Sequence, residues 1–222
     1  MRPDATVVEL SVDRIPAQPL APSTLPDLPE ASDTAVRILA AGLDLFAQRG
    51  YHATSIRDIA AGAGLQSASL YTHFASKEAI LAELVTVGHR VHNRLLVSAL
   101  IGAGSEPQEQ LRQVMAAHVA AHCRWVKLAA VSTRELASLS EPAAAAAMAL
   151  RNSSVELLVG VIERGLAQGV FVVDQVDITL SALGSLGQAV INWYPAKAGT
   201  YTPEEVGETY AALTLKMVGA TS

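Results

Sequence analysis

The sequence predicts an all-α protein, with an N-terminal three-helix helix-turn-helix domain (31–80) followed by a larger helical domain (81–222). Apolar residues recur at helical spacing through most of the second region, and no segment there shows strand alternation. Residues 54–77 contain two short amphipathic segments separated by Gly62-Ala63-Gly64, which predicts a tight turn. The 222-residue chain is 50% hydrophobic and 17% charged, which suits one small and one larger domain.

Residues 1–30 are expected to form a disordered arm. The segment contains six prolines and lacks sustained helical or strand periodicity.

A short helix is predicted to begin after Thr54-Ser55. The two hydroxyls can cap free backbone amides, and Asp58 follows Ser55 by three residues, as in a capping box. Apolar residues at helical spacing over 56–60 continue the helix. The helix should therefore end at the Gly62-Ala63-Gly64 turn.

A second short helix follows that turn, with Leu65, Leu70 and Phe74 as its buried positions. Ser67-Ala68-Ser69 forms its first turn. In a helix-turn-helix, the first residues of the second helix meet base edges, and small polar side chains allow close entry into the major groove. The sequence therefore predicts a DNA-binding motif, although a tight helical corner inside a core is the alternative.

Polar side chains around this helix are candidates for contacts with DNA. Ser67 and Ser69 suit base edges, whereas Tyr71, His73 and Lys77 can reach phosphate oxygens. Lys77 also begins a third helix, whose free amides favour an anion.

Residues 65–77, with the preceding helix, resemble the tetracycline-repressor (TetR) family of bacterial transcription regulators, and the likeness extends from Asp33 to Leu81. The matching residues are Phe46, Gly50, Tyr51, Thr54, Ile59, Ala60, Gly64, Leu70, Tyr71, Phe74 and Lys77. The resemblance implies a buttressing helix, Thr34–Arg49. It also implies that Thr54 and Lys77 hold phosphates. The implied candidates for base or backbone contact are Arg57, Gln66, Ser67, Ser69, Tyr71 and His73.

The formal net charge of −5 is unusual for a DNA-binding protein. Residues 31–80 hold four basic and four acidic residues, however, and residues 1–30 hold two basic and five acidic ones. We expect a few placed contacts, helix dipoles and dimer symmetry to provide binding. Arms that enter the minor groove normally carry more Arg or Lys, so a passive arm is favoured over one that touches DNA.

Residues 81–222 are expected to form a ligand-binding and dimerisation domain of five or six helices. With the third helix of the motif included, the predicted helices are Ser76–Leu100, Pro107–Leu128, Val131–Leu139, Pro142–Gln168, Val176–Tyr194 and Pro203–Val218. A single cysteine, Cys123, excludes an internal disulfide and indicates a reducing compartment. The sequence shows neither a secretory signal nor an uninterrupted apolar span of about twenty residues, so we expect a cytoplasmic protein without membrane contact.

The helix Val176–Tyr194 mixes leucines with Ser, Ala and Gly, which let another helix approach closely. With Tyr210, Leu213, Leu215 and Met217 of the last helix, it resembles the family's dimer interface, a four-helix bundle. An ordinary core helix is the alternative. A homodimer is expected, because a lone helix-turn-helix needs a partner to reach two half-sites about one turn apart.

His118, His122 and Trp125 are expected on one face of the helix Pro107–Leu128, beside Cys123. They could form a metal site, or they could line a pocket or a helix surface. The sequence places no carboxylate near them, which favours the pocket or surface, so we predict no metal and no cofactor.

Arg134 and Arg151 interrupt apolar stretches. They are either solvated residues, members of half-buried ion pairs, or groups that orient the polar head of a ligand in an apolar cavity.

The segment Ile191–Glu205 resembles a C-terminal pattern of TetR regulators of lipid, sterol and fatty-acid catabolism, several of which acyl-CoA thioesters release from DNA. Asn192 and Trp193 would then pack at the pocket or dimer edge, with core packing as the alternative. Pro195–Ala198 replaces the more usual basic turn, which leaves the ligand class open.

Together these features predict a ligand-responsive transcriptional regulator, with repression favoured, that binds a palindromic double-stranded operator as a dimer. A small effector, such as an acyl-CoA or another lipid-derived molecule, would release it. The alternatives are a drug-efflux regulator that senses an aromatic or cationic compound, and a helical interaction protein without DNA binding. No nucleophile, base and orienting group stand at informative spacings, so we expect no enzyme.

Overall fold

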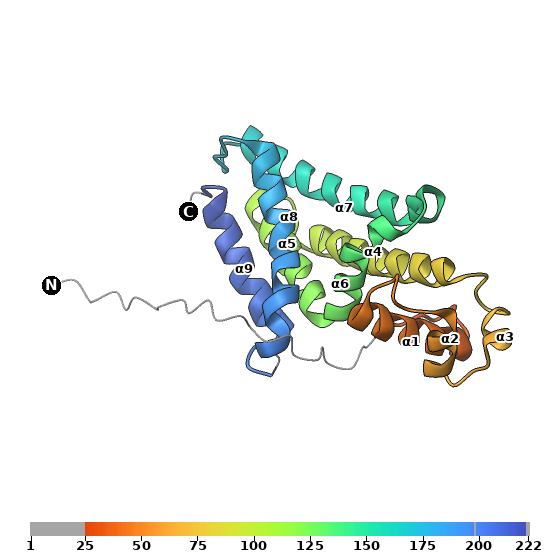
Figure 1. Ribbon diagram of the computed structural model, residues 1–222. Coiled ribbons are helices and arrows are strands. Elements are labelled where there is room, and N and C mark those ends of the chain that lie inside the picture. The colour runs from red at the N-terminus through yellow and green to blue at the C-terminus, as the bar shows by residue number, and fades with distance from the viewer. Residues whose placement is uncertain (1–24, 198, 221–222) are drawn as a thin grey trace.

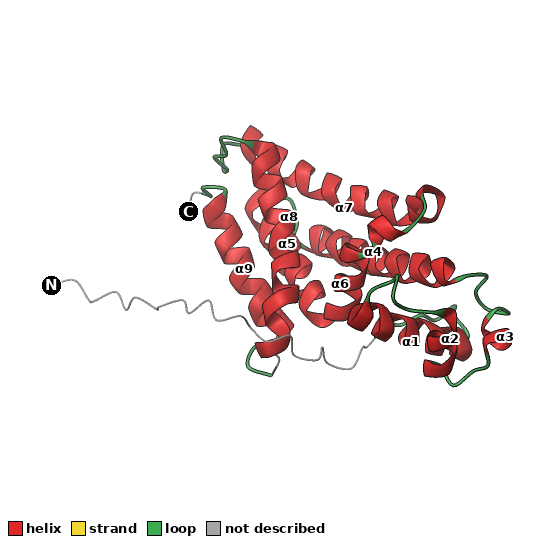
Figure 2. Ribbon diagram, viewed as in Figure 1, coloured by secondary structure: helices red, strands yellow, loops and turns green. Residues whose placement is uncertain are grey.

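The computed structural model describes residues 25–197 and 199–220, and within that part of the chain the regular elements are helices (Figures 1 and 2). The predicted all-α class is confirmed. The helices are α1 (Asp33–Arg49), α2 (Ile56–Gly62), α3 (Ser67–Leu70), α4 (Lys77–Gly102), α5 (Pro107–Arg124), α6 (Val126–Arg134), α7 (Glu141–Ala167), α8 (Val176–Trp193) and α9 (Pro203–Met217), with short 3₁₀ helices η1 (Leu136–Ser138) and η2 (Tyr194–Lys197).

Most of the predicted arm lies outside the described residues. Its last part, residues 25–30, is ordered against the first core, because Leu25 and Leu28 pack on that core. The prediction of disorder up to residue 30 is therefore wrong for this short stretch.

The local signals at the helix-turn-helix are confirmed. Ser55 and Asp58 form the predicted capping box at the start of α2. Gly64 has φ +67°, a left-handed conformation that favours glycine, and it turns the chain toward α3. Ser76 caps α4 by accepting a hydrogen bond from the backbone N–H of Ala79.

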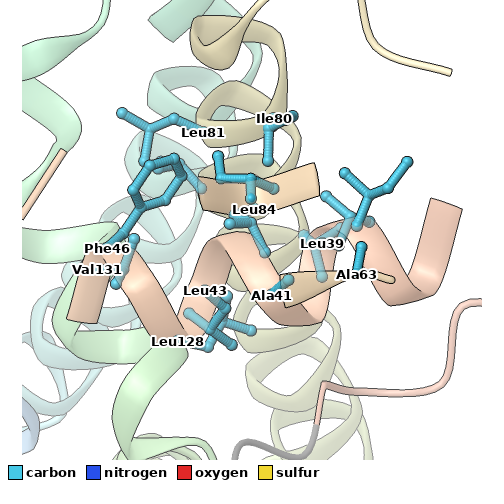
Figure 3. Close-up of a cluster of buried hydrophobic side chains, with 14 of the residues drawn as sticks. Leu39, Ala41, Leu43, Phe46, Ala63, Ile80, Leu81, Leu84, Leu128 and Val131 are labelled. Carbon is cyan, nitrogen blue, oxygen red and sulfur yellow. The ribbon is translucent and has the colours of Figure 1, made fainter. Parts of the chain in front are cut away.

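The first hydrophobic core joins α1 to α4 and α6. Figure 3 shows buried side chains from these helices packed together, among them Leu39, Leu43, Phe46, Ile80, Leu81, Leu84, Leu128 and Val131. Because α4 runs unbroken from Lys77 into the C-terminal region, this core continues past residue 80. The helix-turn-helix therefore packs into the same hydrophobic core as part of the larger domain.

One predicted helix boundary in the second domain is wrong. The expected helix Pro107–Leu128 ends at Arg124, and α6 spans the break that was expected near residue 130. Trp125 adopts φ −120° and ψ 54°, outside the helical region, although neither Gly nor Pro marks this position.

Helix α5 lies at the centre of the C-terminal domain and packs against α4, α7, α8 and α9. By length and composition α7 could cross a membrane, since an 18-residue window of it reaches a mean hydropathy of 1.3. The apolar sequence of this helix is interrupted by the charged residues Arg151, Glu156 and Glu163. The helix packs against α4 and α5. In this fold α7 serves as a helix of the effector domain.

The α1–α4 contact should dominate the stability of the N-terminal core. Replacing the fully buried Leu84 by Ala should lower the free energy of unfolding by about 2–5 kcal/mol, because it removes buried methyl groups and leaves a cavity. Ile101 on the same helix is 77% exposed, so Ile101→Ala is the matched control and should change stability by less than about 0.5 kcal/mol. Chemical denaturation of both variants measures the difference in their free energies of unfolding. Equal losses of stability would contradict the assignment of Leu84 to the N-terminal core.

Candidate DNA-binding and effector sites

The helix-turn-helix is held together by contacts that leave its outer surface free. Ile59 and Leu70 are fully buried beneath α2 and α3. The Arg37 guanidinium donates a hydrogen bond to the carbonyl of Ala63, which ties α1 to the turn between the two helices. The motif therefore presents α3 at one end of the molecule, as Figure 1 shows.

Most predicted DNA-contacting side chains lie on this outer surface. Arg57, Gln66, Ser69, Tyr71 and His73 are exposed, and Ser67 is half-buried. Tyr71 has 53% of its surface exposed, so its ring is accessible from outside the protein.

Lys77 and Thr54 have roles inside the protein. The Lys77 ammonium donates 2.7 Å hydrogen bonds to the carbonyl oxygens of Tyr51 and Thr54, and it lies 4.1 Å from the centre of the Tyr51 ring. The buried Thr54 hydroxyl donates to the carbonyl of Gly50. We call this set of contacts the Lys77 clamp. It fixes the start of α4 to the loop before α2, whereas the predicted phosphate contacts of Lys77 and Thr54 stay predictions.

Two polar contacts connect the DNA-reading helices to the effector domain. Lys127 of α6 pairs with Asp44 of α1 at 2.7 Å. The Glu78 carboxylate of α4 accepts a 2.8 Å hydrogen bond from the backbone N–H of Ser140, just before α7, and this bond lowers the pKa of Glu78. These two contacts thus join α1 and α4 to α6 and to the residue before α7.

The effector domain contains a cluster of imidazoles that the sequence indicated only in part. His118 and His122 of α5 meet His92 of α4, with ring centres 4.7–5.3 Å apart. His92 was missed because it is 26 residues from His118 in the sequence. A usable signal existed: two pairs of histidines at helical spacing, His89 with His92 and His118 with His122.

Hydrogen bonds fix which nitrogens of two rings carry protons. The carbonyl of Gly184 on α8 lies 3.2 Å from His118 Nε2, and the carbonyl of His118 lies 2.8 Å from His122 Nδ1. A carbonyl only accepts, so both nitrogens are N–H donors. Lone pairs therefore remain on His118 Nδ1 and His122 Nε2, and His92 Nε2 donates to His118 Nδ1 at 2.8 Å.

Burial keeps these rings neutral. Desolvation, reinforced by the charge of His122, lowers the pKa of His118 to about 3. Desolvation also lowers the pKa of His92 and that of His122. The pKa of His89 falls to about 4, through burial and then the positive charge of Arg151. The cluster is thus uncharged at neutral pH.

The structure does not gather the other predicted ligand-binding residues around these rings. Trp125 ends α5 and packs against the first core, so the expectation that it shares a helix face with His118 is wrong. Arg134, Arg151 and Asn192 are exposed.

Trp193 donates a 3.2 Å hydrogen bond to the Tyr210 hydroxyl and stacks on its ring. Cys123 packs in a third small core with Val190 and Tyr194, where burial raises the pKa of its thiol to about 12. A recess of about 520 Å³ beside residues 25–40 is lined by none of the predicted ligand-binding residues.

Comparison with known proteins agrees with this geometry. Residues 38–84 match the bacterial regulatory proteins of the tetR family, and residues 104–218 match the tetracyclin repressor-like C-terminal domain. The transcriptional repressor KstR2 of Mycobacterium tuberculosis is 31% identical over 175 residues, which cover 77% of this chain and 86% of that protein.

Solved structures show the same fold. A tetR-family regulatory protein from Rhodococcus RHA1 has a TM-score of 0.79 and 30% identity, with 86% of this chain and all of that chain covered. The structure of KstR2, described as a ketosteroid transcriptional regulator, has a TM-score of 0.77 and 28% identity, covering 87% and 97% of the two chains. AibR, solved with isovaleryl coenzyme A and operator DNA, shares the fold at a TM-score of 0.70 and 21% identity, covering 85% and 100%.

The fold and the exposed helix-turn-helix thus define a bacterial transcription regulator. The chain belongs to the TetR family, and the curated relatives that it matches include transcriptional repressors named KstR2. These relatives are transcriptional regulators rather than enzymes.

The Lys77 clamp should stabilise the protein even without DNA. Lys77→Met keeps the aliphatic chain but removes the hydrogen bonds to two carbonyls, so the free energy of unfolding should fall by about 1.5–3 kcal/mol. The control Arg57→Met changes an exposed cation of α2 and should leave stability unchanged. Thermal or chemical unfolding of the DNA-free protein measures the stability of both variants. If Lys77→Met unfolds as wild type does, the hydrogen bonds of Lys77 do not contribute to stability.

Proposed function

We propose that this protein is a ligand-responsive repressor that binds a two-fold symmetric operator as a homodimer in the cytoplasm, with no catalytic activity. The observation that carries the proposal is the exposed polar surface of α2 and α3, which the Lys77 clamp holds at one end of the molecule. Arg57, Gln66, Ser67, Ser69, Tyr71 and His73 are the proposed contacts with bases or the DNA backbone, and Thr54 and Lys77 with phosphates. Close entry of α3 into the major groove agrees with its short side chains.

The proposed dimer interface consists of the outer faces of α8 and α9. Ile178 on α8 is 64% exposed, and Leu213 and Met217 on α9 are 46% and 45% exposed. Other outward positions of α8 are small, such as Ser181 and Ser185. The predicted interface helices are therefore supported, but Leu183 and Val190 are buried within the subunit and do not belong to its outer face.

The proposed effector is an acyl-CoA thioester or another lipid-derived molecule. The relatives named KstR2 support this class, since one is described as a ketosteroid regulator. The fold itself accommodates both a thioester and DNA in AibR. His118, His122, Trp125, Arg134, Arg151, Asn192 and Trp193 were the predicted ligand contacts, and of these the two histidines are the ones enclosed between helices α4, α5 and α8.

Operator selection tests the proposal directly. Duplexes selected by the purified protein from a random pool should contain a two-fold symmetric motif with half-sites about one helical turn apart or a multiple of it. Binding to the winning duplex should weaken about 10-fold or more when a long-chain or sterol-derived acyl-CoA is added, because an effector must bind the released state more tightly. Release by cationic or aromatic drugs instead would favour the efflux regulator.

Single substitutions separate DNA reading from folding. Tyr71→Ala should weaken operator binding by about 10-fold or more without changing stability, because the ring is exposed and its contacts lie outside the protein. Val172→Ala is a matched control, since that side chain is also exposed but belongs to the loop before α8. If Tyr71→Ala and Lys77→Ala both bind every DNA as wild type does, the protein is a helical interaction protein rather than a repressor.

The interface can be tested through the oligomeric state. Leu213→Glu should convert the dimer to a monomer in sedimentation experiments, because it places a charge in an apolar contact. Ile101→Glu, an exposed apolar residue at the end of α4, should leave the dimer intact. If only the Ile101→Glu variant dissociates, the dimer interface does not lie on α8 and α9.

A further inference from the structure

We propose that His92, His118 and His122 bind a divalent transition-metal ion, for which zinc is the best match, between α4 and α5 and against α8. A metal site would be a property separate from the repressor function, because metal binding can be measured without DNA and without an organic effector. The three rings come from two helices that are packed side by side.

The spacing of the rings suits a metal ion. One ring nitrogen from each histidine lies within 4.8 Å of the others. Zinc–nitrogen bonds of about 2.0–2.1 Å in a tetrahedral site put the nitrogens ~3.4 Å apart. The nitrogen separations, from 2.8 Å between His92 Nε2 and His118 Nδ1 to at most 4.8 Å within the cluster, bracket that value.

The outer contacts of the rings also suit a metal ion. Histidines that bind metals generally donate their second N–H to a carboxylate or backbone carbonyl, which fixes the ring and its tautomer. His118 and His122 do so through the carbonyls of Gly184 and His118. Both are left with a lone-pair nitrogen. His92 contributes its Nε2 once the ring proton moves to Nδ1, so the ion replaces the hydrogen bond between His92 and His118 without a change of charge on either ring.

The donor set and the local charge select the ion. Three neutral imidazoles suit zinc, copper or nickel, whereas magnesium and calcium need oxygen ligands. The neutral imidazole, which keeps a free lone pair on one ring nitrogen, is the form that coordinates. His89 supplies a further imidazole nearby, and its Nε2 is buried without a hydrogen-bond partner among the described residues.

Helix α8 leaves space for the rings through a glycine. A Cβ atom at Gly187 would lie 2.4 Å from His118 Nε2 and 2.8 Å from His122 Nδ1, closer than such atoms approach. At Gly184, one turn earlier, a Cβ would meet nothing within 4 Å. Gly187 therefore allows both histidines to keep their carbonyl contacts.

A bound ion would connect the effector domain to the DNA-reading end. It would cross-link α4 to α5, and His92 lies fifteen residues after Lys77 on the continuous helix α4, or ~22 Å along the axis. The ion would thus stiffen the helix that carries the Lys77 clamp.

Metal binding is measured on the tag-free full-length protein after treatment with a chelator. Zinc titrated against a competing indicator should bind at one ion per chain, and the cobalt-loaded protein should show the visible bands of tetrahedral cobalt. A 100-fold excess of zinc over its Kd should raise Tm by roughly 5–10 °C. Magnesium and calcium should neither bind at this site nor raise Tm.

Substitutions show whether these rings are the ligands. His92→Gln and His122→Gln should each weaken zinc binding by more than about 100-fold, since loss of an outer contact alone typically costs 10–100-fold. His52→Gln, which changes an exposed histidine in the loop before α2, should leave zinc affinity unchanged. Circular dichroism of the metal-free variants confirms that they fold.

A pair of glycine variants keeps every ligand and tests the geometry. Gly187→Ala should weaken zinc binding by about 10–100-fold, because its Cβ displaces two rings, whereas Gly184→Ala should bind zinc as wild type does. The proposal is overturned if wild type binds no stoichiometric zinc. It is equally overturned if the His92 and His122 variants bind zinc as tightly as wild type. In either case the three rings form only a half-buried hydrogen-bonded network.

Discussion

The attachment of α4 to the helix-turn-helix is the constraint on which the rest of the structure depends. The Lys77 ammonium satisfies two carbonyls of the loop before α2 and lies over the Tyr51 ring, so it fixes the start of α4 to that loop. Hydrogen bonds to a charged group are among the stronger ones in proteins, and here they act at the first residue of a 26-residue helix. One continuous helix therefore takes part in the cores of both the N-terminal and the C-terminal regions.

This shared element gives a physical route for regulation. Allosteric release requires that an effector bind one arrangement of the helices better than another. Helix α4 takes part in the first core at its N-terminal half and contacts α5 near His92 at its C-terminal half. The Lys127–Asp44 pair and the Glu78–Ser140 bond add two further links between the domains. These contacts form a continuous path of packed helices between the histidine cluster and the helix-turn-helix.

The sequence predicted the parts of this fold that local chemistry determines. Ser55 with Asp58 set the start of α2, and Gly64 marks the turn, because capping and left-handed backbone each demand particular residue types. The break at Trp125 carries no such mark, since packing against the first core imposes it. The meeting of His92 with the histidines of α5 was likewise hidden, because it depends on how two helices pack. Two of the three clustered imidazoles, His118 and His122, were thus visible as a helical spacing, and the place of His92 required the tertiary structure.

If effector binding in the C-terminal domain moves the helix-turn-helix, the distance between the two subunits of the dimer measures that movement most directly. A spin label at the exposed Ala61 of α2, in a Cys123→Ala background that removes the buried native thiol, reports the separation of the two helix-turn-helix units. With selected operator bound, the dimer should show one narrow distance, and an effector that releases DNA should shift that distance by several ångströms. An unchanged distance distribution, in protein that the effector demonstrably binds and releases from DNA, would contradict transmission through α4.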